Sequence, residues 1–165
     1  MSQIIGVVVG IVKSKPDRLG QIEVHFPWLS DDNTTSLARV ATLMAGPERG
    51  SWFMPEIGDE ALVAFEHGDV EHPYIIGFLW NGKDKPPQTD PQIRLLRSVN
   101  EHAIEIKDSK VTDGDKGYIQ IKDAHGNIIE LANARISITG VSVIEIKAPQ
   151  VMINGRPVLP APGPI

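Results

Sequence analysis

Residues 118–147 read YIQIKDAHGNIIELANARISITGVSVIEIK, and this stretch decides the class of fold. Apolar and polar residues alternate in short units, such as Ile119-Gln-Ile121 and Ile136-Ser-Ile138. Strict alternation over a few residues indicates β-strands with one buried face. Turn-forming residues separate the units, as at Gly126-Asn127 and Gly140. The stretch therefore predicts a series of short strands joined by turns.

The alternating units recur through the C-terminal half of the chain. Their first members are Ile104, Ile119, Ile129, Ile136, Ile144 and Val151, which lie 15, 10, 7, 8 and 7 residues apart. Internal periodicity of this kind is typical of a β-solenoid or β-helix. Each unit offers only two or three apolar residues, and a ribbon of a few strands is marginal in water. We therefore expect three copies of the chain to bury this face around a common axis, as a closed homotrimer.

The predicted core of this trimer consists of the apolar members of the units. They are Ile104, Ile106, Ile119, Ile121, Ile129, Leu131, Ile136, Ile138, Ile144, Ile146, Val151 and Ile153. The intervening polar residues are predicted to face water, and they are Glu105, Lys107, Gln120, Lys122, Ser137, Glu145 and Lys147. The assembly would be a stiff, needle-like rod.

The N-terminal half has a different pattern. Five strands are predicted, at Ile4–Val12, Leu19–Phe26, Leu37–Leu43, Glu60–Glu66 and Tyr74–Trp80. Five short strands in fewer than ninety residues suit a small closed or partly closed barrel. Prolines 86, 87 and 91 then disfavour helix and central strand, which indicates an extended linker. The predicted boundaries are 1–85 for the barrel, 86–98 for the Pro-rich linker, 99–154 for the needle and 155–165 for a Pro-rich tail.

Charge and composition narrow the classes of function. The net charge of the chain is −5, and residues 1–90 carry 7 basic and 13 acidic side chains. A barrel that binds nucleic acid should be basic, so we expect no nucleic-acid partner. The alternative is a barrel that binds single-stranded nucleic acid or oligosaccharide, with the repeats as an oligomerisation stalk. Its stacking residues would be Trp28, Trp52 and Trp80, with Phe26, Phe53 and Tyr74.

Candidate catalytic and metal-binding groups are few. The chain has no cysteine, and its serines lack the context of a nucleophile elbow. The carboxylates of Pro55-Glu-Ile-Gly-Asp-Glu60 are interpreted as a turn that leads into a strand. We therefore expect no catalytic residue, no metal site and no cofactor. The N-terminus has an apolar run without a basic segment before it, which predicts synthesis in the cytoplasm without a signal peptide.

A set of short motifs in the N-terminal half carries a family resemblance. In chain order, after Asp17, they are Gly20-Gln-Ile-Glu-Val-His-Phe-Pro-Trp28, Leu37-Ala-Arg-Val-Ala41, Ala45-Gly46, Gly50, Pro55-Glu-Ile-Gly-Asp-Glu60, Val63-Ala-Phe-Glu-His-Gly-Asp69, Pro73-Tyr-Ile-Ile-Gly-Phe-Leu-Trp-Asn-Gly82 and Pro86-Pro87. In this order they resemble the OB-fold domain of phage baseplate assembly protein V, of the VgrG proteins of type VI secretion and of extracellular injection spikes. The repeats look like the intertwined triple-stranded β-helix that follows the barrel in that family.

The resemblance implies an all-β homotrimer with an OB-fold barrel and a triple-stranded β-helix. Its implied role is the non-enzymatic central spike of a contractile tail, type VI apparatus or phage tail-like particle. The spike would sit on the baseplate hub and tube-initiator proteins and pierce the target cell envelope. Some relatives bind iron at the tip through His-x-His, but the histidines here never stand two apart. A PAAR-type tip protein is implied instead, docking on Val151, Ile153, Arg156, Val158 and Leu159.

Overall fold

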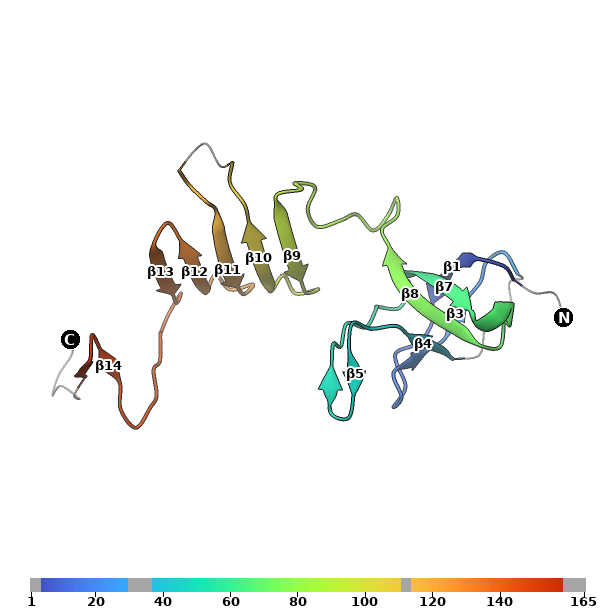
Figure 1. Cartoon of the computed structure of the whole chain (residues 1–165), viewed down its shortest axis with the longest axis horizontal. Helices are drawn as coiled ribbons and strands as arrows, with labels where there is room; N and C mark the ends of the chain where they lie inside the picture. Colours follow the sequence, from blue (N-terminus) through green and yellow to red (C-terminus); the bar gives the residue numbers. More distant parts are fainter. Residues whose placement is uncertain (1–3, 30–36, 111–113, 159–165) are drawn as a thin grey trace. The chain divides into compact units, whose positions relative to one another are not determined.

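The structure is a computed structural model, which describes residues 4–29, 37–110 and 114–158. The chain divides into two compact units, Met1–Pro86 and Pro87–Ile165. Within the described ranges there is no α-helix, and a single 3-10 turn, η1 (Glu66–Gly68), interrupts the strands (Figure 1). The predicted all-β class is therefore confirmed. The part of the chain that the structure describes contains no helix long and apolar enough to cross a membrane.

The first unit is a six-stranded sheet with a small hairpin. Its strands are β1 (Val7–Val12), β2 (Gln21–Ile22), β3 (Val24–His25), β4 (Ala38–Val40), β7 (Glu60–Phe65) and β8 (Pro73–Leu79). The order across the sheet is β2-β4-β8-β7-β1-β3, and all neighbours are antiparallel except β4 and β8. The hairpin is formed by β5 (Ala45–Gly46) and β6 (Arg49–Gly50).

One bent stretch of chain nearly closes this sheet into a barrel. The predicted strand Leu19–Phe26 is split at Glu23 into β2 and β3, which lie at opposite ends of the strand order. At the bend, Lys13 N–H donates to the Glu23 carbonyl (2.9 Å) and Glu23 N–H donates to Ser14 Oγ (3.0 Å). The backbone groups at the bend are therefore hydrogen-bonded. The nearly closed sheet confirms the predicted barrel.

The barrel core collects the inward members of the alternating strands. It consists of Val12, Ile22, Val24, Phe26, Ala38, Ala61, Val63, Phe65 and Ile75. Phe26 packs edge-on against Phe65, with ring centroids 5.5 Å apart. Gly10 makes room for it, because a Cβ there would lie 2.3 Å from Val24 Cγ1 and 2.8 Å from Phe26 Cε1.

The second unit is an antiparallel meander of five strands, drawn side by side in Figure 1. They are β9 (Ile93–Arg97), β10 (Ala103–Lys107), β11 (Tyr118–Lys122), β12 (Ile128–Ala132) and β13 (Arg135–Thr139). A short hairpin, β14 (Met152–Ile153) and β15 (Arg156–Pro157), follows.

Two details of this unit differ from the sequence interpretation. Residues 93–97 were assigned to the linker, but they form β9 and pair with β10. The unit Ile144-Glu-Ile146 was expected to form a strand, but residues 141–151 form none in the single chain. Both differences concern pairing partners, which an alternating pattern does not specify.

Candidate functional site

The candidate functional site is the apolar face of the five-stranded sheet, which we call the isoleucine face. The strand register places eight predicted core residues in two rows across β10 to β13. One row contains Ile104, Ile121, Ile129 and Ile138, and the other contains Ile106, Ile119, Leu131 and Ile136. Their side chains are between 42% and 72% exposed in the single chain. Burying such a side chain fully is worth about 1.5–3 kcal/mol, so this face is a strong candidate for association.

The other predicted core residues lie beyond the sheet. Ile144 joins Ile121, Ile129 and Ile138 in the lining of a groove of about 450 Å³, so it extends the isoleucine face. Ile146 and Ile153 are 69% and 66% exposed, and the structure does not bring them onto the sheet.

A polar network covers the opposite face of the sheet. Tyr118 Oη donates to Glu105 Oε1 (2.5 Å), and Lys122 Nζ lies 3.8 Å from Glu105 Oε2. Gln120 Nε2 donates to Glu130 Oε2 (3.0 Å). Glu105 was predicted to face water, and this was wrong, because its side chain is only 11% exposed. The network therefore satisfies these polar groups within one chain.

Titration of Tyr118 tests this network. Its pKa is raised from the ordinary 10.0 to about 12, mainly because its hydroxyl donates to the Glu105 carboxylate, with smaller effects of burial and of the Glu105 and Glu130 charges. The folded state thus holds this proton more tightly than the unfolded chain. The resulting stability should be complete below pH 10.0 and decline as the pH rises towards about 12.

Urea denaturation of the natural chain and of Tyr118→Phe across this pH range measures the effect. The difference between the two should shrink as the pH rises, since the variant has no hydroxyl to titrate. A difference that is independent of pH would contradict the hydrogen bond between Tyr118 and Glu105.

The turn between β11 and β12 holds the chain as it leaves the sheet. Asp123 Oδ1 accepts from the backbone N–H groups of His125 and Asn127, each at 2.9 Å. Asn127 Oδ1 in turn accepts from the N–H of Val141 (2.9 Å). The hydrogen bonds of Asp123 with Asn127 also lower the Asp123 pKa. The direction in which the chain continues after Gly140 is therefore set by a side chain fourteen residues upstream.

The residues predicted to dock a tip protein gather at the β14–β15 hairpin. Ile153 pairs with Arg156, and Val158 N–H donates to the Val151 carbonyl (2.8 Å). The structure thus brings four of the five together, and Leu159 lies outside the described residues. Whether they bind a tip protein stays a prediction.

Carboxylates and histidines of the described ranges form no group of three or more that could hold a metal ion. Asp59 Oδ2 accepts from the N–H of Glu56 (2.9 Å), which agrees with a turn at Pro55–Glu60. Asp69 accepts from Glu71 N–H and contacts His72, and these hydrogen bonds lower the Asp69 pKa. Both carboxylates therefore have structural partners within their own turns.

One exposed apolar element was missed by the sequence interpretation. Residues 42–54 form a hairpin around β5 and β6, and Leu43, Met44, Trp52 and Phe53 are at least 54% exposed. The sequence did contain a signal for this hairpin. The apolar pairs Leu43-Met44 and Trp52-Phe53 flank Gly46-Pro-Glu-Arg-Gly50, and a turn between apolar residues favours a hairpin.

The first unit of the chain is similar to domains of known proteins. Residues 4–80 match the family model of the type VI secretion system/phage-baseplate injector OB domain. The type VI secretion system spike protein VgrG3 of Vibrio cholerae is 34% identical over 79 residues, which are 46% of this chain and 8% of that protein. VgrG5 of Pseudomonas aeruginosa is 36% identical over 87 residues, 50% of this chain and 11% of that protein. The actin cross-linking toxin VgrG1 of V. cholerae is 32% identical over 80 residues, 46% of this chain and 7% of that protein.

The matches therefore cover about half of this chain, in its N-terminal part, and only a small fraction of each relative. They confirm the predicted resemblance to VgrG-like spikes for the barrel.

Proposed function

The N-terminal half of this chain belongs to the type VI secretion system/phage-baseplate injector OB domain family. On this premise we propose that the protein is a structural subunit of the central spike of a contractile injection machine. The observation that carries the proposal is the pairing of this domain with the isoleucine face in one chain. Two curated relatives are named as type VI secretion spike proteins, which supports a mechanical role without catalysis.

Three copies assemble through the isoleucine face. A cyclic trimer turns this face of every copy towards one axis and leaves the network of Glu105, Tyr118 and Lys122 on the outside. Residues 141–151 then extend the rod as an intertwined β-helix, in which neighbouring copies supply the strand partners that the single chain does not provide. The product is a needle with an apolar core and satisfied backbone groups.

The spike works as a rigid body. The barrels seat on the hub and tube-initiator proteins of the baseplate, and the needle points towards the target cell. On contraction the trimer transmits axial force and pierces the envelope. A PAAR-type protein caps the blunt end at the β14–β15 hairpin, where Ile153 and Val158 are 66% and 46% exposed.

Light scattering on the purified full chain tests the proposal. We expect a molar mass of three times 18.0 kDa, and a trimer that persists in detergent at temperatures that unfold ordinary barrels. Such resistance follows because a trimer with an interlocked core must break many contacts at once. A stable monomer at micromolar concentration would overturn the proposed assembly and, with it, the spike.

A further inference from the structure

An arm, residues 42–54, extends from the barrel between β4 and β7 and carries the β5–β6 hairpin (Figure 1). Its hydrogen bonds are internal: Thr42 Oγ1 donates to the Ser51 carbonyl (2.7 Å), and Ser51 N–H donates to the Met44 carbonyl (3.1 Å). At Gly50 (φ 154°) a Cβ would lie 2.6 Å from that same carbonyl oxygen, so the close crossing requires glycine. The arm is therefore preformed in the single chain.

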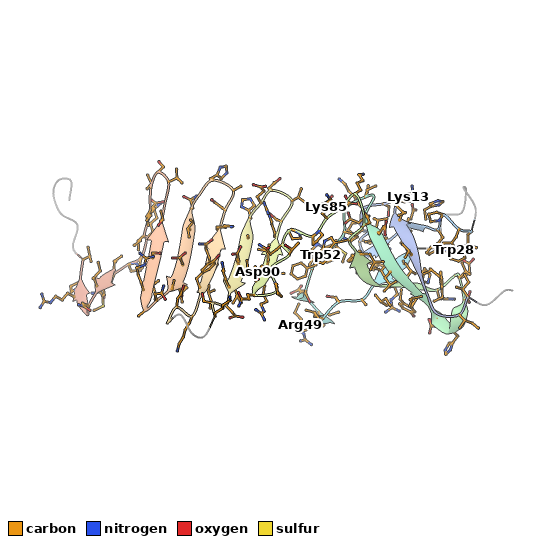
Figure 2. All side chains as sticks on the ribbon, turned by 90° about the horizontal axis from the view of Figure 1, so that it is seen from above. Lys13, Trp28, Arg49, Trp52, Lys85 and Asp90 are labelled. Atoms are coloured by element: carbon orange, nitrogen blue, oxygen red, sulfur yellow. The ribbon has the colours of Figure 1, made fainter. Side chains whose placement is uncertain are left out.

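The arm exposes an apolar surface of the size that interfaces use. Leu43 is 96% exposed, Met44 54%, Trp52 66% and Phe53 64%. Together they leave on the order of 500 Å² in water, which is near the largest patch of an ordinary monomer. A standard interface buries about 800 Å² per partner, so the arm supplies more than half of one side. Arg49 lies in the hairpin, and Trp52 lies on the stretch that returns to the barrel (Figure 2).

A second apolar surface lies on the outside of the same barrel, and we call it the wall. Val8, Gly10 and Val12 of β1 alternate with Val7 and Val9, which are 54% and 40% exposed. The register places Val7 beside Ala64 and Val9 beside Leu62 of β7, and Leu62 beside Gly77 of β8. The wall residues named here carry no charge, and Glu60, which the register places beside Ile11 on the same face, borders them.

Gly77 leaves a shallow open space on this wall, because it has no side chain; we call this space the dent. A Cβ at Gly77 would meet no heavy atom within 4 Å, so open space adjoins the half-buried Leu62. An aromatic ring that lies over a glycine in a sheet covers its exposed backbone and packs on the neighbouring side chains. Trp52 and Phe53 are the exposed rings of the arm.

A cyclic trimer requires two different surfaces on each copy, because successive subunits meet head to tail away from the axis. The arm and the wall are two such surfaces on one barrel. We propose that the arm of one copy docks on the wall of the next copy, with Trp52 or Phe53 over Gly77, and so locks the three barrels into a collar. This inference rests on the proposed trimer.

Photocrosslinking of the full chain tests the docking. The photoreactive residue p-benzoylphenylalanine replaces Phe53, and irradiated protein is separated by denaturing electrophoresis and mapped by mass spectrometry. We expect crosslinked dimers and trimers, with the crosslinks on β1, β7 or β8. Crosslinks to the second unit, or within one chain only, would overturn the docking.

A substitution that fills the dent beside Gly77 provides a variant for comparison. Gly77→Val should lower the yield of crosslinked dimers at least tenfold, because the methyl groups occupy the place of the ring. Gly82→Val is the control, since Gly82 is equally open but lies outside the wall, and its yield should be unchanged. Equal yields in both variants would overturn the docking at Gly77.

Light scattering on the same samples separates the two proposals. Both glycine variants should remain trimers, since the isoleucine face is intact. A trimer without crosslinks to the wall overturns the collar and leaves the proposed spike standing, whereas a monomer overturns both.

Discussion

Ile138→Asp is expected to leave the chain monomeric. Ile138 lies on β13 opposite Ile129, in a row of the isoleucine face, and is 58% exposed in the single chain. In the proposed trimer the three copies of residue 138 lie close to the common axis. Three carboxylates would then lose water near one another without a cationic partner, at a cost of several kcal/mol per trimer. Light scattering should show a fall from three chains to one.

The neighbouring residue Thr139 offers a control substitution that introduces the same charge. Thr139 follows Ile138 on the same strand and therefore points to the opposite face, where it pairs with Ile128. Thr139→Asp should assemble like the natural chain. A normal trimer from Ile138→Asp would refute the proposed inward face, and the loss of trimers from Thr139→Asp would show that charge on either face is harmful.

Phe26→Ala is expected to destabilise the barrel by about 3–5 kcal/mol, which is the usual cost of emptying a buried phenylalanine site. Phe26 is fully buried and contacts the rings of Phe65 and Trp28. The nearly closed barrel leaves little freedom to collapse into the cavity. Urea denaturation followed by tryptophan fluorescence measures the loss selectively, because Trp28, Trp52 and Trp80 all lie in the first unit.

An exposed apolar residue of the same unit gives the comparison for Phe26. Ile57 is 56% exposed, so Ile57→Ala should change the free energy of unfolding by less than about 1 kcal/mol. A comparable loss in both variants would contradict a core centred on Phe26. Retained trimers in Phe26→Ala would agree with assembly through the second unit.

Much of the fold could be predicted from local pattern. Alternation at Ile136-Ser-Ile138 and similar units correctly assigned eight isoleucine-face residues to one side of the strands, because successive side chains of a strand point to opposite faces. Each of the five predicted barrel strands overlaps a strand of the sheet for the same reason, although Leu19–Phe26 is split into β2 and β3. The motifs around Gly20–Trp28 and Pro73–Gly82 indicated the family that the comparison confirms.

Some of the site required the three-dimensional structure. Glu105 reads as a solvent-facing residue in its alternating unit, but Tyr118 and Lys122 of the next strand cover it. The arm was missed because its apolar residues flank a turn of only a few residues. Residues 144–146 have a strand pattern without a strand partner in the single chain.

The amino-acid sequence by itself determined that the chain is all-β and on which side of strands β10 to β13 the apolar residues lie. The tertiary structure alone decided that the chain bends at Glu23 and nearly closes the barrel, that Glu105 is buried, and that Asn127 holds the chain at Val141. The reason is physical. Side-chain alternation is a property of consecutive residues, whereas strand order, closure and burial depend on hydrogen bonds and contacts between residues far apart in the chain.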